Sequence, residues 1–322
     1  MTFDHIITGA AGFVGGHLCR HPDVDSEKSK TALLDLLPID FASRESSITD
    51  IRSLADLNRL AQRWAAPTLI HLAALAEVVM PFTMMRELVD TNVVGTINVL
   101  DCFRPERAVF ASSSAVYGSR GDRPALPQLD DCSAAGTYGA SKVMGELVCA
   151  SWAAENESRS VILRFGNIVG PGCRGLIPYL VDHGVKNPEG ELAAQLRGNG
   201  RIVRDYLPVE YAIDSIMNAA ALPLDAGQAV VFNVGSGRGI SNREVAEFVA
   251  EIMRNRGFRM NLDFDNPLPF GESDSVVLEV SDTRERLDVA IPSLNDIYAS
   301  IEQSTLWHLE HQLSRNASGA NA

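Results

Sequence analysis

The sequence lacks the features of several protein classes. Its five cysteines, at positions 19, 102, 132, 149 and 173, include no C-x-x-C pair. This pattern argues against a disulfide framework or a zinc site and predicts a reduced, cytoplasmic protein with no bound metal. Basic residues are scarce: the chain has 28 lysines and arginines against 41 aspartates and glutamates, and its formal net charge is −13. The excess of acid disfavours nucleic acid and anionic membrane surfaces as partners.

Long apolar runs are absent as well. The most apolar stretch, around 68–80, is interrupted by His71 and Glu77 and followed by Pro81, so no membrane span is expected. An apolar run already begins at residue 5, which leaves no room for a signal peptide. No internal repeat or low-complexity block is visible. With 322 residues, 46% hydrophobic and 21% charged, the chain has the balance of a soluble protein with a full core.

Glycine is concentrated where a strand is expected to turn into a helix. Residues 8–15 read TGAAGFVG, directly after an apolar run and directly before an apparent helix. Gly9 allows the tight turn, Gly12 lets the backbone approach a pyrophosphate, and Gly15 lets the helix pack closely on the strand. Asp35 closes the next apolar run, about twenty residues further on, where a ribose-binding carboxylate belongs. These features predict a dinucleotide site.

The rest of the chain alternates between short apolar runs and helical patterns. The runs expected to be strands are 5–8, 31–35, 46–49, 68–72, 107–112, 160–166 and 229–234, and the clearest helices are 53–64, 84–103 and 138–155. This alternation predicts an α/β fold with a doubly wound parallel sheet of the Rossmann type.

The alternation loosens after Gly166, where prolines and glycines accumulate. We therefore expect residues 1–168 and about 205–240 to form the Rossmann domain. A smaller substrate-binding lobe is expected from about 169–204 and 241–312. The small and polar residues 313–322 are expected to be a disordered tail.

A second motif carries acid–base chemistry. Tyr138-Gly-Ala-Ser-Lys142 places a phenol and an ammonium four residues apart, on one face of a predicted helix. A nearby cation lowers the pKa of a tyrosine, and a nicotinamide cation would add to this, so the phenol can serve as general acid or base near neutral pH. Upstream, the predicted strand ends in the hydroxyl run 112–114. A serine there either hydrogen-bonds a substrate oxygen or caps the next helix.

Together these motifs resemble the extended short-chain dehydrogenase/reductases of the NAD-dependent epimerase/dehydratase family, closest in pattern to UDP-glucose 4-epimerases. The resemblance runs from about Phe3 to Trp307. Its motifs are TGAAGFVG, Asp35, Thr49-Asp50-Ile51, His71-Leu-Ala-Ala74, Thr91-Asn-Val-Val-Gly-Thr96, FASSSAVYG, YGASK, Leu163-Arg-Phe-Gly-Asn167-Ile-Val-Gly-Pro171, Arg204-Asp-Tyr206 and Phe232-Asn-Val-Gly-Ser-Gly237.

The resemblance implies a set of site residues. Asp35 would hold the adenosine ribose, and because no basic residue follows it, NAD is favoured over NADP. The implied cofactor site consists of Gly9, Gly12, Phe13, Val14, Gly15, Asp35, Asp50, Ile51, Leu72, Ala73, Ala74, Asn92, Tyr138 and Lys142. The implied catalytic residues are Tyr138, Lys142 and Ser113, and the position of Ser113 is obtained by counting back from Tyr117. Ser113, Asn167 and Arg204 would contact the substrate, a nucleotide-diphosphate sugar and most readily a UDP-sugar. For Arg204, a surface ion pair with Asp205 is the alternative.

The residues after Ser113 separate the reactions of the family. Dehydratases carry Asp-Glu there and decarboxylases a glutamate, whereas this chain has Ser114 and Ala115. The implied reaction is epimerisation at C4 through a transient 4-keto sugar. An NAD-dependent dehydrogenase or ketoreductase is the alternative, and a non-enzymatic NAD-sensing protein a more remote one. The family also implies a homodimer through the helices 84–103 and 138–155. The chain departs from the family in 267–275, which lacks the usual basic residue, and in 76–79.

Overall fold

The fold was examined in a computed structural model that describes residues 1–24, 29–41, 44–77, 80–120, 123–127, 132–268 and 272–317. Residues 78–79 and 269–271, within the two segments that depart from the family, lie outside these residues. So do the last five positions, 318–322. No helix of the described residues is long and apolar enough to cross a membrane.

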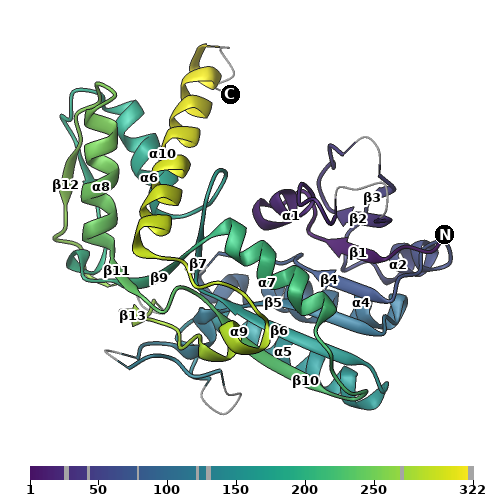
Figure 1. Ribbon diagram of the computed structural model, residues 1–322. Helices are drawn as coiled ribbons and strands as arrows, with labels where there is room; N and C mark the ends of the chain where they lie inside the picture. Colours follow the sequence, from purple (N-terminus) through teal and green to yellow (C-terminus); the bar gives the residue numbers. More distant parts are fainter. Residues whose placement is uncertain are drawn as a thin grey trace.

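A seven-stranded parallel sheet forms the centre of the molecule (Figure 1). Its order is β10-β6-β5-β4-β1-β2-β3, so the chain winds outward in both directions from β1 and β4. The strands are β1 (His5–Thr8), β2 (Thr31–Asp35), β3 (Ser46–Ile48), β4 (Thr68–His71), β5 (Arg107–Ser113), β6 (Arg159–Phe165) and β10 (Ala229–Val234). The predicted doubly wound Rossmann sheet is confirmed. Three of the seven predicted strands have the observed bounds, and the other four differ by one residue at one or both ends.

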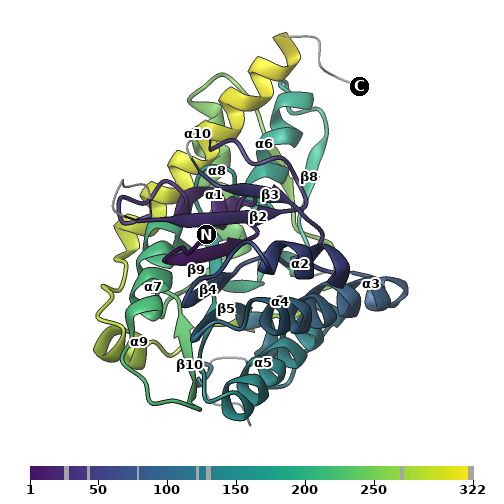
Figure 2. The ribbon, with the colours of Figure 1, turned by 90° about the vertical axis from the view of Figure 1, so that its right-hand side faces the viewer.

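Both faces of the sheet are covered by helices, since its strands are apolar on both sides. Ile7 and the other strand residues that point to the same face of the sheet pack under α1 and α7. Ile6 and the strand residues that point to the opposite face pack under α2, α4 and α5. Figure 2 shows α7 on one side of the strands and α2, α4 and α5 on the other. These helices are α1 (Phe13–Leu18), α2 (Leu54–Ala61), α4 (Gly95–Phe103), α5 (Thr137–Glu155) and α7 (Val209–Ala221).

A second, smaller body stands beyond the carboxyl ends of the strands. Its own apolar core lies between three helices, α6 (Leu176–Lys186), α8 (Asn242–Arg254) and α10 (Leu294–Ala317), which stand together at the left of Figure 1. Ser241 caps α8 in a reciprocal capping box with Glu244, which fixes where that helix begins. The strands β8 (Ala193–Gln195) and β12 (Asn261–Asp263) pair in parallel at its edge.

A four-stranded sheet joins the two bodies. The strand β9 (Val203–Pro208) pairs with β7 (Asn167–Val169), β11 (Gly239–Ser241) and β13 (Ser275–Val276). Strand β9 then leads directly into α7, which packs on the large sheet. The chain therefore crosses between the bodies at the places where the sequence pattern loosens.

Two details of the expected domain boundaries differ from the structure. Helix α9 (Ser281–Arg286) contacts β10, and Leu287 and Val289 belong to the core under the large sheet. This short segment lies within the predicted lobe 241–312, but it carries too few apolar residues to show a helical period. Residues 313–317 continue α10 instead of belonging to a disordered tail, because a packed helix propagates past its last buried residue, Leu309.

Candidate active site

The glycine loop between β1 and α1 is shaped by close backbone contacts. Gly9 has φ +77°, and a Cβ there would lie 2.6 Å from the backbone nitrogen of Ala73. A Cβ on Gly15 would lie 2.0 Å from the carbonyl oxygen of Gly9. Both positions therefore require glycine, the first for the turn and the second for the packing of α1. Gly12 is exposed at the N-cap of α1, so the backbone there is open to a ligand.

Asp35 lies at the end of β2 beside this loop. Its two carboxylate oxygens each accept one backbone N–H bond, from Ala11 at 2.9 Å and from Leu37 at 2.9 Å. A carboxylate has about four acceptor positions, so it retains acceptors for the hydroxyls of a ribose. The two residues expected beside the adenine have other contacts. Arg52 binds the Asp50 carboxylate at 2.7 Å and lowers its pKa, and the Ile51 side chain is buried.

A chain of hydrogen bonds begins at the carboxyl ends of β1 and β4 and runs into the helical segment 92–96. The ring of His71, fully buried, lies between Thr8 Oγ1 at 2.6 Å and Thr96 Oγ1 at 3.0 Å. Burial, helped by the charge of Lys142, lowers the pKa of His71 to about 3, so the ring is neutral. Because Thr96 donates its own proton to the carbonyl oxygen of Asn92, His71 Nε2 carries the hydrogen and Nδ1 accepts from Thr8. Directly above, Leu72, Ala73 and Ala74 are half-buried.

Asn92 sits in a π-helical turn that sequence periodicity did not reveal. The predicted helix 84–103 is divided into α3 (Met85–Val89), the π turn η2 (Asp90–Val94) and α4. The wide turn leaves the Asn92 carbonyl free for Thr96. The Asn92 amide bonds the backbone of Leu75 at 2.8 and 3.0 Å and Ser141 Oγ at 2.9 Å. Asn92 thus fastens the loop after β4 to helix α5, as π turns at functional sites often do.

Ser113, Tyr138 and Lys142 converge at the carboxyl end of β5. Ser113 lies near enough to the phenol of Tyr138 to affect its pKa, and it caps the turn after β5 by accepting from the Ala115 N–H at 3.2 Å. The structure thus shows the capping role that the sequence left open for Ser113, and its contact with a substrate oxygen stays a prediction. Lys142 Nζ donates to the carbonyl oxygen of Ala111 at 2.8 Å and lies 6.0 Å from the centre of the Tyr138 ring.

Burial dominates the acid–base properties of this group. It raises the pKa of Tyr138 to about 12, against the opposing effect of the Ser113 hydroxyl. Burial also lowers the pKa of Lys142 to about 8, although Cys149 and Glu146 oppose the shift. Burial therefore outweighs the lowering of the tyrosine pKa that was expected from the lysine, since the phenol and the ammonium are both taken out of water. At pH 7 the phenol is protonated and the lysine mainly charged.

A narrow cavity of ≈ 40 Å³ adjoins Ser113. Asn167, exposed at the start of β7, and Arg204 on β9 also line it, so the structure brings the three predicted substrate residues together. Arg204 does not pair with Asp205. It contacts Glu272 Oε1 at 3.2 Å and the carbonyl oxygen of Ser273 at 2.7 Å, because neighbouring residues of a strand point to opposite faces.

A buried ion pair behind the site was not identified from the sequence. Arg164 on β6 and Glu146 on α5 are both fully buried, with Arg164 Nη2 2.6 Å from Glu146 Oε2. Glu146 also accepts a short hydrogen bond from Ser112, and Arg164 donates to Tyr117 Oη at 2.9 Å. Lys142 lies one helical turn before Glu146, and the pair therefore fixes both β5 and α5 around the predicted catalytic group.

The Rossmann sheet, the glycine loop and the tyrosine–lysine helix define an extended short-chain dehydrogenase/reductase. The model of the NAD-dependent epimerase/dehydratase family matches residues 5–235, more than half of the chain, and the protein therefore belongs to that family. The resemblance inferred from the motifs is confirmed, and NAD is the cofactor.

Individual relatives are similar along nearly the whole chain. A UDP-glucose 4-epimerase of Rhizobium meliloti (strain 1021) is 24% identical over 94% of this chain and 96% of its own length. A UDP-N-acetyl-alpha-D-glucosaminuronate decarboxylase of Bacillus cytotoxicus is 26% identical over 83% of this chain and 85% of its own. The structure of MoeE5 in complex with UDP-glucose and NAD superposes with a TM-score of 0.82 at 24% identity, covering 96% of this chain and 99% of that one. This last likeness concerns the fold.

Proposed function

We propose that the protein epimerises a nucleotide-diphosphate sugar at C4, with a UDP-sugar as the substrate class. The observation that carries the proposal is the wall of the cavity beside Ser113. Ser114 and Ala115 line it together with Asn167 and Arg204. The two residues after Ser113 supply no carboxyl group, and dehydration or decarboxylation in this family would need one there. Proton transfer at a single carbinol, by Tyr138, needs no such group.

In this proposal each residue of the site has a separate role. Ser113 holds the C4 oxygen by a hydrogen bond, and Tyr138 takes the proton of the C4 hydroxyl and returns it after the ring has turned over. When bound, NAD would supply the redox chemistry, by accepting the C4 hydride and giving it back to the opposite face of the ring, so that the sugar is neither oxidised nor reduced overall. Because burial keeps the phenol protonated at pH 7, the charge of Lys142 and the nicotinamide cation of bound NAD would together have to lower its pKa before it accepts the proton. Arg204, with Asn167 beside it, would bind the diphosphate, for which the guanidinium fork is well suited.

The glycine loop and the segment Leu72–Ala74 fit an NAD molecule. A Cβ at Gly9 or Gly15 would collide with backbone, and Gly12 leaves an open face for the pyrophosphate. We assign the ribose to Asp35. We place Phe13, Val14 and the Leu72–Ala74 segment along the cofactor, all of which are half-buried. Ile51 can take part only through its backbone, because its side chain packs in the core.

Incubation with a panel of UDP-, dTDP- and GDP-sugars tests the proposed reaction. Inversion at C4, followed by NMR, is the expected result with at least one UDP-sugar. The purified protein is expected to retain NAD through the turnover. Net oxidation or reduction of the sugar, with release of the reduced cofactor, would instead establish the dehydrogenase alternative.

Asp35 is expected to determine the choice of cofactor. Asp35→Ala removes charged hydrogen bonds to the ribose, so NAD should bind about tenfold more weakly or worse. The wild-type protein should bind NAD more tightly than NADP, because the carboxylate repels a 2′-phosphate. Dissociation constants from titration calorimetry measure both effects. Asp40→Ala, at an exposed carboxylate, is the matched control, and equal or tighter binding of NADP would overturn the assignment.

A homodimer is proposed through α4 and α5. Leu88 and Leu100, two of the apolar residues in the predicted helix 84–103, are buried against the protein itself. Ile97 on α4 and Leu147 on α5 are 39% and 53% exposed and line the same surface cavity of ≈ 360 Å³. An isologous contact between two copies would cover both.

Analytical ultracentrifugation measures this association. We expect a species of twice the 34.8 kDa chain mass, and Leu147→Glu should convert it to the monomer by placing a charge in the interface. Leu192→Glu, at a residue 63% exposed in the other body, should leave the mass unchanged. A wild-type protein that sediments as a monomer at every concentration would contradict the proposal.

A further inference from the structure

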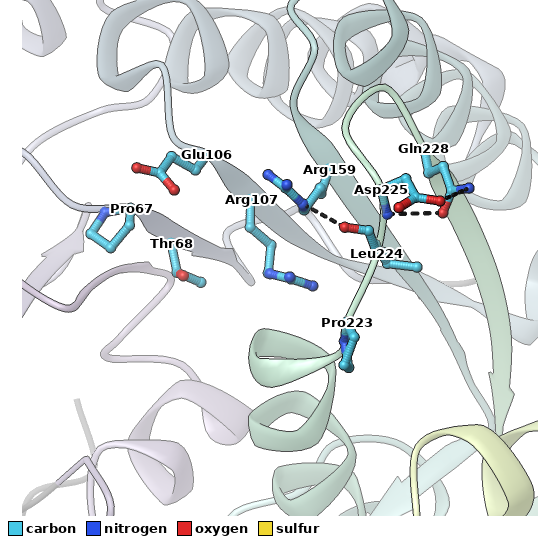
Figure 3. A pocket seen from close by; sticks show the side chains of 9 residues that line it. All are labelled: Pro67, Thr68, Glu106, Arg107, Arg159, Pro223, Leu224, Asp225 and Gln228. Atoms are coloured by element: carbon cyan, nitrogen blue, oxygen red, sulfur yellow. Dashed lines mark hydrogen bonds between the residues drawn. The ribbon is translucent and has the colours of Figure 1, made fainter.

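A cavity of ≈ 480 Å³ opens at the amino end of the large sheet (Figure 3). It lies at the edge opposite the predicted active site, since Arg107 begins β5 and Ser113 ends it. Six strand steps separate the two residues by about 20 Å. The cavity has the size of a small-molecule site, and its lining includes two arginines, Arg107 and Arg159.

The pairing of β5 with β6 forces these arginines together. Arg107 and Arg159 are register partners on neighbouring parallel strands, which lie about 4.8 Å apart and direct paired side chains to the same face. Figure 3 shows both side chains projecting between Glu106 and Asp225. Both are half-buried, and neither forms an ion pair with any residue that the structure describes. Burial and the charge of Arg159 lower the pKa of Arg107.

The hydrogen bonds that the two arginines form within the protein account for only part of their arrangement. Arg107 Nη1 donates to the carbonyl oxygen of Ala219 at 3.3 Å, near the end of α7, and Arg159 Nε donates to that of Leu224 at 2.8 Å. A cation at a helix C-terminus is favourable. Each bond, however, occupies one of the five N–H groups of a guanidinium and leaves its charge unneutralised. Two adjacent cations thus remain in a chain that carries an excess of acid.

We propose that this cavity is a binding site for a phosphate-bearing small molecule. The two guanidiniums, side by side on paired strands, offer the forked donors that a phosphate dianion accepts. Glu106 and Asp225 flank them within the same cavity and can accept hydrogen bonds from hydroxyl groups. A sugar phosphate matches both halves of this lining, whereas inorganic phosphate matches only the first.

Titration calorimetry at constant ionic strength, with inorganic phosphate and with glucose 6-phosphate as the two probes, tests the site. Wild-type protein should bind at least one probe, and R107Q/R159Q should weaken that binding by at least about tenfold. R254Q, which removes the same charge from an exposed position at the end of α8, should bind like the wild type. Tighter binding of glucose 6-phosphate would identify a sugar phosphate, and equal binding would assign the site to phosphate itself.

Two further variants serve as controls for this experiment. R204Q removes the arginine of the cavity beside Ser113 and should leave the binding of both probes unchanged. If R107Q/R159Q does not fold, R107K/R159K keeps the charge and removes the fork, and it should still bind more weakly than the wild type. The proposal is overturned if the wild type binds neither probe at millimolar concentration, if R204Q abolishes binding, or if the folded double variant binds as the wild type does.

Discussion

Replacing Tyr138 by phenylalanine is expected to reduce turnover by about 10²- to 10⁴-fold, the usual contribution of a general acid–base group. The ring is 7% exposed, and phenylalanine fills the same volume, so the fold and NAD binding should be retained. The loss arises because the phenol is the group proposed to move the C4 proton. Steady-state kinetics on the sugar identified in the nucleotide-sugar panel, together with NAD titration, measures the two effects separately.

The neighbouring serines provide a graded control for Tyr138→Phe. Ser113→Ala removes one hydrogen bond to the reacting oxygen and leaves the base in place, so its effect should be smaller. Ser114→Ala should be nearly silent, because Ser113, and not Ser114, is the serine that affects the pKa of Tyr138. A larger loss for Ser114→Ala than for Ser113→Ala would shift the catalytic position by one residue. Full activity of Tyr138→Phe would exclude the proposed mechanism.

Removing one partner of the buried Arg164–Glu146 pair is expected to destabilise the protein by about 3–5 kcal/mol. Arg164→Met leaves a carboxylate that is 0% exposed, and among the residues that the structure describes only the Ser112 hydroxyl still donates to it. An uncompensated charge in the interior costs far more than the packing that methionine restores. Chemical denaturation followed by circular dichroism gives the free energy of unfolding.

An exposed ion pair is the matched control for Arg164→Met. Lys186 and Asp182 are four residues apart on α6, with Nζ 2.8 Å from the carboxylate and side chains 70% and 36% exposed. Lys186→Met should therefore cost at most about 1 kcal/mol. Similar losses for the two variants would mean that Glu146 is stabilised by something other than its arginine. The double replacement Glu146→Leu with Arg164→Met should recover much of the loss, since it leaves no unpaired charge.

Local patterns were sufficient to predict the parts of the site that lie close together in the chain. The glycines at 9, 12 and 15 and the Tyr138–Lys142 spacing depend on the geometry of one turn and one helix, so the sequence displays them directly. The chain positions of the seven strands of the large sheet follow in the same way, because each is a short apolar run between helices.

Features that depend on distant segments could not be predicted. The ion pair of Arg164 with Glu146 is invisible in the sequence, since an arginine within a strand gives no sign that it will be fully buried. The π turn at Asn92 breaks the helical period for a single turn, which periodicity over 84–103 averages out. Burial also reversed the expected direction of the Tyr138 pKa. Each depends on what surrounds a residue after the chain has assembled.

The hydrogen bonds that begin at Thr8 and His71 determine which parts of the site can form first as the chain is synthesised. They pass from Thr8 through His71, Thr96 and Asn92 to Ser141, whose hydroxyl binds the carbonyl oxygen of Tyr138 at 2.7 Å. Contacts between such distant segments form only after the entropy of closing long loops has been overcome. During synthesis, Thr8, His71 and Thr96 can therefore bond one another first, whereas the Asn92 amide gains its hydrogen bond to Ser141 only after helix α5 has emerged from the ribosome.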